Sequence, residues 1–199
     1  MKPNPWESLM GKFHELRSSI KDPSSGAFPR VVSVVSAADG EGKTTVAACL
    51  AMSLARLDQR VAVVDLNFRT PGLCEFFSRP RATGVSDVLT GKAPLEEVVQ
   101  DVSGVHVVCT GMATVNDPLE LLESPGMGNL LETLKKNYSV VIFDTPPLSE
   151  YQDGVVIAQY ADFVIYVIAR GRTSRERVKE AIGLLGNKRI GIVLNRDRG

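Results

Sequence analysis

The sequence predicts an α/β fold, in which a mostly parallel β-sheet is flanked by helices on both faces in three α/β/α layers. Short apolar runs rich in β-branched residues recur along the chain, as expected for strands that are covered on both sides. Segments of helical length separate them, and such alternation joins parallel strands through right-handed crossovers. Ligands of these sheets bind beyond the carboxyl ends of the strands, so we expect the functional residues there.

The expected elements follow the chain in order. The predicted strands are 31–36, 61–66, 105–110, 140–145, 162–169 and 190–195. The predicted helices are 43–58, 126–137, 152–160 and 174–185. All of them fall within one predicted domain, residues 30–199, because a chain of 199 residues is long enough for one substantial core but not for two.

Residues 1–29 are expected to precede this domain as an amphipathic helix and a linker. Apolar residues in the first part mostly recur every three or four positions, the spacing of one helical face: Trp6, Leu9, Met10, Phe13, Leu16 and Ile20. The stretch DPSSGAFP, residues 22–29, then supplies the proline, serine and glycine that are typical of a linker.

The composition argues against several classes of function. The 23 basic and 23 acidic residues balance, so there is no overall field for nucleic acid or anionic lipid, and we expect no nucleic-acid partner. No apolar run reaches the roughly 18 residues of a membrane span, so we expect no transmembrane segment. Cys49, Cys74 and Cys109 are odd in number and widely spaced, which favours reduced thiols over a disulfide framework or a zinc site.

The stretch VVSVVSAADGEGKTT, residues 31–45, predicts a phosphate-binding loop (P-loop). Ala37, four further residues and then Gly42, Lys43 and Thr44 fit the relaxed P-loop pattern, between a predicted strand and a predicted helix. Glycines let backbone N–H groups turn towards phosphate oxygens, the lysine neutralises them, and the threonine hydroxyl serves Mg²⁺. The alternative is an ordinary strand-to-helix turn with an exposed lysine. The predicted nucleotide-binding residues of this loop are Asp39, Gly40, Glu41, Gly42, Lys43, Thr44 and Thr45.

Two aspartates end predicted strands and are expected to face this loop. Asp144 follows the run VVIF and Asp65 follows the run VAVV. A P-loop enzyme needs acidic groups at neighbouring strand ends to hold the metal and to position the nucleophile. We therefore expect Thr44, Asp65 and Asp144 to bind Mg²⁺, and Lys43, Asp65 and Asp144 to act in catalysis. The alternative for each aspartate is a helix cap or a turn.

Four segments resemble, in order and spacing, the motifs of the bacterial tyrosine kinases (BY-kinases), which regulate capsule and exopolysaccharide assembly and belong to the deviant P-loop ATPases. They are SAADGEGKTT, VAVVDLNFRTPGL, TGMATVNDPLELLES and VVIFDTPPL, and the resemblance covers residues 7–199. It implies Walker A, A′ and B roles for the first, second and fourth segments, ATP and Mg²⁺ as cofactors, and Asn195 and Arg196 near the adenine. Ala38 stands where partition and division-site ATPases carry a second lysine, which favours the kinase branch.

Three departures from the family pattern bear on activity and assembly. Walker A′ reads DxDxR in the family, but here Asn67 replaces the second acid, and an amide cannot act as a general base. The motif ExxRxxR of the N-terminal helix, which implies ring assembly, reads Gly11, His14 and Arg17 here, so a homo-oligomer stays open but the family's ring is not predicted. The family's C-terminal tyrosine cluster has no counterpart among the four tyrosines, which are Tyr138, Tyr151, Tyr160 and Tyr166.

The resemblance implies a cytoplasmic kinase that transfers phosphate from Mg-ATP to tyrosine. It also implies a partner, a membrane-embedded polysaccharide co-polymerase that activates the kinase at the inner face of the plasma membrane. The departures leave a second hypothesis open, an ATP-binding switch or slow ATPase that regulates a polysaccharide-export partner. A third is an interaction module with a vestigial loop, against which Lys43, Thr44 and Asp144 argue, because folding does not require that trio.

Overall fold

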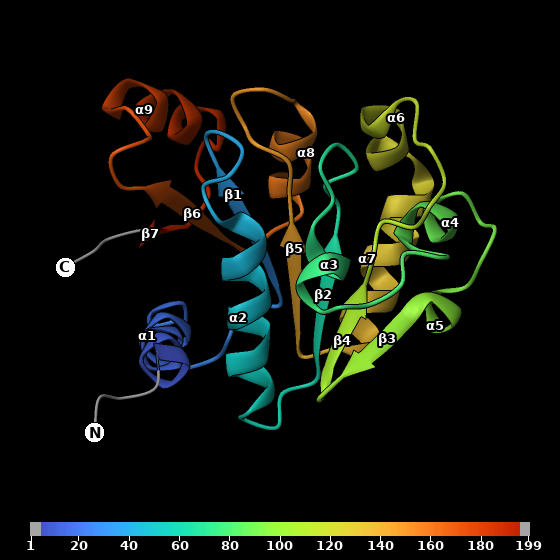
Figure 1. Ribbon diagram of the computed structural model, residues 1–199, viewed down its shortest axis with the longest axis horizontal. Helices are drawn as coiled ribbons and strands as arrows, with labels where there is room; N and C mark the ends of the chain where they lie inside the picture. Colours follow the sequence, from blue (N-terminus) through green and yellow to red (C-terminus); the bar gives the residue numbers. More distant parts are fainter. Residues whose placement is uncertain (1–4, 196–199) are drawn as a thin grey trace.

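The computed structural model describes residues 5–195 and places a seven-stranded sheet between two layers of helices (Figure 1). The strand order is β3-β4-β2-β5-β1-β6-β7. The strands are β1 (Val31–Ser36), β2 (Val61–Asp65), β3 (Val99–Val102), β4 (Val105–Val108), β5 (Val140–Asp144), β6 (Phe163–Ala169) and β7 (Ile190–Asn195). The helices are α1 (Pro5–Ser19), α2 (Lys43–Ala55), α3 (Leu73–Phe76), α4 (Val85–Leu89), α5 (Leu95–Val98), α6 (Pro118–Glu123), α7 (Pro125–Asn137), α8 (Asp153–Gln159) and α9 (Arg175–Leu184).

The predicted fold class is confirmed. The six predicted strands are β1, β2, β4, β5, β6 and β7, and the four predicted helices are α2, α7, α8 and α9. Among the described strands every pairing is parallel except that of β3 with β4. The strands β1, β2 and β5 are buried along their whole length, which explains why their sequences are continuous rather than alternating apolar runs.

Successive residues of the central strands face two separate apolar clusters. Val31 and Val35 of β1 pack in the cluster that α7 and α8 cover, while Val32 and Val34 pack in the cluster that α1, α2 and α3 cover. Each fully buried valine contributes about 1.5–3 kcal/mol relative to an exposed one. The hydrophobic effect therefore holds both helical layers against the sheet, and the polar strand ends are left as the place for chemistry.

The N-terminal helix α1 packs on α2 (Figure 1). Phe13 and Ile20 are buried in the same cluster as α2. The guanidinium group of Arg17 donates to the hydroxyl oxygen of Ser53 on α2, at 3.2 Å, and to the Ser53 carbonyl. Arg17 is thus engaged within its own chain. No helix within residues 5–195 is both long enough and apolar enough to cross a bilayer.

Five of the elements between β2 and β5 are not predicted from the sequence: α3, α4, α5, β3 and α6. Strand β3 reads VQDV and is only partly buried at the sheet edge, so it lacks the continuous apolar pattern of the other strands. The helices α3, α4, α5 and α6 have four to six residues, too few for a helical period to show.

The expectation of reduced thiols is wrong for two of the three cysteines. Cys74 and Cys109 form a disulfide with a Cα–Cα distance of 5.7 Å, whereas Cys49 is free and buried. The two bonded residues are 35 positions apart. Pairing of β2 with β4 brings the helix after one strand beside the end of the other, and no local pattern in the sequence reveals that proximity.

Two glycines of α7 give a matched test of how closely the helices pack. A Cβ atom at Gly126 would overlap the backbone carbonyl of Leu89, whereas a Cβ at Gly128 would meet nothing within 4 Å. We expect Gly126→Ala to lower the free energy of unfolding by about 1–3 kcal/mol through overpacking. Gly128→Ala should raise it by up to about 1 kcal/mol, because alanine favours the helix. Urea unfolding measures both, and equal effects of the two substitutions would contradict the packing described here.

Candidate active site

The candidate site lies beyond the carboxyl ends of β1, β2 and β5, at the edge where the sequence predicts it. The loop after β1 leads into α2, and Asp65 and Asp144 are paired neighbours at the ends of β2 and β5. A cavity of about 500 Å³ opens between this loop and the residues that follow β2. Its lining residues are Asp39, Gly40, Gly42, Lys43, Thr44, Thr45, Asn67 and Thr70.

The P-loop conformation depends on its glycines. Gly40 and Gly42 have φ values of 71° and 101°, which residues with a side chain rarely adopt. Gly42 is the N-cap of α2, and no side chain in the described part of the chain caps this helix of 13 residues. The first N–H groups of α2 therefore point into the cavity with the positive end of the helix dipole, an arrangement suited to phosphate.

Lys43 is buried at the base of the loop. Its ammonium nitrogen lies 3.1 Å from the Ser36 hydroxyl oxygen, 3.5 Å from the Ala38 carbonyl oxygen and 3.5 Å from the exposed carboxylate of Asp39. Of these three contacts, the one with Asp39 is between full opposite charges, and it is accessible to solvent. An anionic ligand in the cavity can therefore compete for the lysine at small cost.

The two strand-end aspartates form a buried, like-charged pair. Asp65 and Asp144 are 1% and 0% exposed. Asp65 accepts hydrogen bonds from the backbone N–H groups of Asn67 (3.1 Å) and Leu73 (3.0 Å), and Asp144 accepts one from the Thr44 hydroxyl (2.5 Å). Burial raises the pKa of both carboxyls above the usual range, and the nearby charge of Asp144 raises that of Asp65 further.

This pair fits a divalent cation. The Oδ1 atom of Asp144 is buried and has no hydrogen-bond partner among residues 5–195, which is costly unless a ligand occupies that side of the carboxylate. Two carboxylates and the Thr44 hydroxyl supply the hard oxygen donors that Mg²⁺ prefers. The residues predicted to bind the metal, Thr44, Asp65 and Asp144, therefore lie together, and their role as ligands stays a prediction.

Asn67 closes the loop after β2. The family pattern predicts only that an acid is absent at this position, not that the amide holds the loop. Its amide oxygen accepts from the Thr70 N–H at 3.0 Å, and its amide nitrogen donates to the Thr70 carbonyl (3.0 Å) and hydroxyl (3.1 Å). Arg69 in this loop donates from Nε to the buried carboxylate of Asp153 at 2.9 Å and lies over the Tyr151 ring. The sequence does not predict the role of Asp153. The signal that could have found it is Arg69 itself, because an arginine four positions after Asp65 is a reason to search for a buried counter-charge.

Two of the remaining predicted residues, Glu41 and Asn195, brace the P-loop. Glu41 is buried, and its carboxylate accepts from the Ala38 N–H (3.1 Å) and the Thr173 hydroxyl, so it is turned away from the cavity. The side-chain amide of Asn195 donates to the Glu41 carbonyl at 2.8 Å and lies against Gly42. Thr45 is exposed at the start of α2. The expected place of Asn195 beside the adenine stays a prediction, and Arg196 lies outside the described residues.

Comparison with known proteins identifies the family. A family model described as an AAA domain matches residues 29–184. Tyrosine-protein kinase YwqD of Bacillus subtilis is 32% identical over 188 residues, which cover 92% of this chain and 79% of that relative. The chain belongs to the bacterial tyrosine-protein kinase family. The resemblance inferred from the four sequence motifs is thereby confirmed.

Solved structures agree with this family assignment. The kinase domain of VpsO superimposes with a TM-score of 0.86 at 32% identity, covering 96% of each chain. The septum site-determining protein MinD of Pyrococcus horikoshii, solved with Mg-ADP, gives a TM-score of 0.70 at 23% identity over 85% of this chain and 71% of that one. At this lower identity the likeness to MinD shows the fold alone, that of a P-loop ATPase.

Neutralising one carboxylate should stabilise the ligand-free protein. Because the folded state raises both pKa values, its stability falls as the pH rises above about 4, the unfolded value. Asp144→Asn keeps an acceptor for Thr44 and removes one charge, so we expect a melting temperature about 2–6 °C higher at pH 8 and a smaller gain at pH 5. Added Mg-ADP should no longer stabilise the variant. The exposed Asp58→Asn is the control, and an equal gain at both pH values would contradict the charged pair.

An acid at position 67 should weaken the loop that Asn67 closes. In Asn67→Asp a carboxylate oxygen replaces the amide donor and faces the Thr70 carbonyl. We expect the free energy of unfolding of the ligand-free protein to fall by about 1–3 kcal/mol, the cost of leaving a buried polar group unsatisfied. Urea unfolding tests this, with Thr70→Ser as a control that keeps the hydroxyl. Unchanged stability would show that Asn67 does not hold the loop.

Proposed function

We propose that this protein is an ATP-dependent protein-tyrosine kinase that transfers the γ-phosphoryl group of Mg-ATP to a tyrosine hydroxyl. One observation carries the proposal: a buried pair of carboxylates, Asp65 and Asp144, lies beneath an intact P-loop with the Thr44 hydroxyl bound to one of them. Membership of the tyrosine-kinase family supports the choice of acceptor.

Each residue acts through a definite contact. The N–H groups at the start of α2 and the ammonium of Lys43 hold the phosphates, and Thr44 and Asp144 hold Mg²⁺. Bound Mg²⁺ supplies positive charge that stabilises the transferring phosphoryl group. Asp65 takes the proton of the incoming hydroxyl, because burial brings its pKa towards working pH and two backbone N–H groups fix its orientation. Asn67 cannot share this role, since an amide does not accept a proton near neutral pH.

The second candidate is an ATP-binding switch or slow ATPase, and Asn67 is the observation that favours it. All of its amide contacts described above go to Thr70 within its own loop, so Asp65 is left as the single acid of Walker A′. Such a protein would bind Mg-ATP and regulate a partner through occupancy of the site.

The proposal extends to partners and location. By the motif resemblance, the protein works at the inner face of the plasma membrane with a membrane-embedded polysaccharide co-polymerase that activates it in exopolysaccharide or capsule synthesis. Residues 1–29 act as an N-terminal helix and linker ahead of the ATP-binding domain, residues 30–199. The Arg17 side chain is held by Ser53 within its own chain, which supports an assembly other than a ring built on that arginine.

Incubation with ATP and Mg²⁺ tests the proposal. We expect phosphotyrosine on the protein or on an added tyrosine peptide. Lys43→Met should lower its rate of formation about a hundredfold or more, as loss of a transition-state charge contact does. The exposed Lys179→Met on α9 is the matched control and should leave the rate unchanged. Phosphate release without phosphotyrosine, or nucleotide binding without either product, would contradict the kinase and support the switch or slow ATPase.

A further inference from the structure

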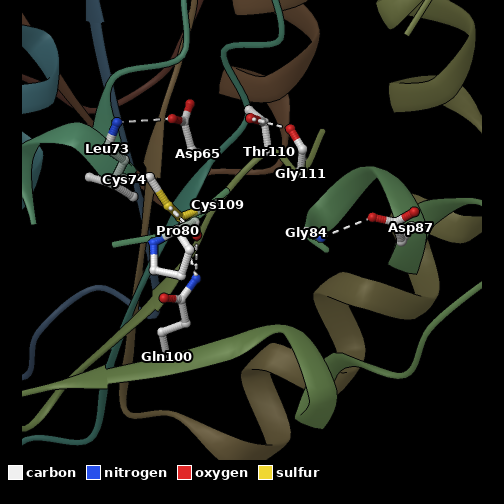
Figure 2. Close-up of a disulfide and its surroundings, with 10 residues drawn as sticks. All are labelled: Asp65, Leu73, Cys74, Pro80, Gly84, Asp87, Gln100, Cys109, Thr110 and Gly111. Atoms are coloured by element: carbon white, nitrogen blue, oxygen red, sulfur yellow. Dashed lines mark hydrogen bonds between the residues drawn. A yellow bond between two sulfur atoms is a disulfide. The ribbon is translucent and has the colours of Figure 1, made fainter. Parts of the chain in front are cut away.

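The disulfide joins the candidate active site to the neighbouring strand end (Figure 2). Cys74 is the second residue of α3, the short helix that follows the Asn67 loop, and Cys109 directly follows β4. Both side chains are buried, with exposures of 2% and 0%. The bond therefore ties α3 to the sheet immediately beside the carboxylate of Asp65.

The residue before Cys74 is a direct contact of Asp65. The Leu73 N–H donates to Asp65 Oδ2 at 3.0 Å, and Figure 2 shows this hydrogen bond next to the disulfide. The Cys109 side of the bond is fixed independently, because its carbonyl accepts from the Val85 N–H at 2.7 Å and its strand pairs with β2. The other side of the bond is α3, a helix of four residues.

Both sulfur atoms also have polar neighbours suited to the reduced state. Cys74 Sγ lies 3.5 Å from the Pro80 carbonyl oxygen, which can accept from a thiol, and Cys109 Sγ lies 3.8 Å from Gln100 Nε2. The same Gln100 amide donates to the Pro80 carbonyl at 3.0 Å. The covering segment, residues 78–83, is exposed, so its displacement gives reagents a route to the sulfurs.

We propose that Cys74 and Cys109 form a reversible thiol–disulfide switch that controls how firmly α3 holds Asp65. A low-molecular-weight disulfide such as oxidised glutathione is the oxidant. The Cys74 thiolate attacks one of its sulfurs and releases one glutathione thiolate. The Cys109 thiolate then attacks the Cys74 sulfur and releases the second, so that two protein thiols and one disulfide yield the protein disulfide and two glutathione thiols. Reduction by excess glutathione reverses both steps.

The expected effect follows from the lost contact. In the oxidised protein the disulfide holds α3 against the sheet. The Leu73 N–H then keeps its hydrogen bond to the Asp65 carboxylate and fixes the orientation of that acid. In the reduced protein α3 can move away, and loss of one hydrogen bond to a charged group predicts a turnover roughly tenfold lower. This effect on turnover rests on the proposed kinase function, whereas the change in the Leu73 amide does not.

The experiment is a redox titration of the folded wild-type protein in mixtures of reduced and oxidised glutathione. Three quantities are followed: the fraction of disulfide, by thiol alkylation and mass; the exchange rate of the Leu73 amide, by NMR; and the rate of tyrosine phosphorylation. The Ile165 amide of the central sheet reports global opening. We expect the first three quantities to change with one midpoint while Ile165 exchange stays constant.

Three variants complete the test. Cys74→Ser and Cys109→Ser should match the reduced protein in Leu73 exchange and in turnover whatever the glutathione ratio. Cys49→Ser is the matched control and should respond as the wild type does, because Cys49 is buried in α2 and burial raises the pKa of its thiol to about 11.

Two results would overturn the switch. The first is a disulfide that excess reduced glutathione cannot open without raising Ile165 exchange. The second is a disulfide that opens while Leu73 exchange stays unchanged. A Leu73 response without any phosphorylation would leave the switch standing and would count against the kinase proposal instead.

Discussion

The repulsion between two buried carboxylates is the constraint around which this site is arranged. Asp65 and Asp144 are register partners on adjacent strands and are almost completely excluded from solvent. Like charges at this depth are costly unless a proton or a cation compensates them. The backbone N–H groups that hold Asp65 and the hydroxyl that holds Asp144 reduce the cost without removing it. A cation or a proton between the two carboxylates would therefore stabilise the folded protein.

The central sheet could be predicted from the sequence because its strands are buried on both faces. A strand such as VVIFD must be apolar throughout, and that pattern is visible without any knowledge of its neighbours. The P-loop and the two strand-end aspartates could be predicted for the same reason, since they follow such strands directly. Strand β3, half exposed at the sheet edge, carries no comparable pattern.

Two contacts between distant segments could not be predicted. The Cys74–Cys109 bond and the Arg69–Asp153 pair depend on which strands are adjacent, and nothing in the local sequence records adjacency. Asn67 shows a subtler limit. Sequence comparison presents it as a lost acid, whereas the structure gives its amide three hydrogen bonds that a carboxylate could not all make. The amide at position 67 thus removes one acid from Walker A′ and at the same time holds the loop closed.

The contact between β7 and the P-loop bears on when the site can form during biosynthesis. Asn195 reaches the Glu41 carbonyl across 154 positions of sequence. A chain emerging from the ribosome presents its P-loop long before it presents Asn195. Until then the loop lacks the side chain that lies against Gly42, and β6 lacks its outer neighbour. The P-loop therefore gains the contacts described here only once the last strand is in place.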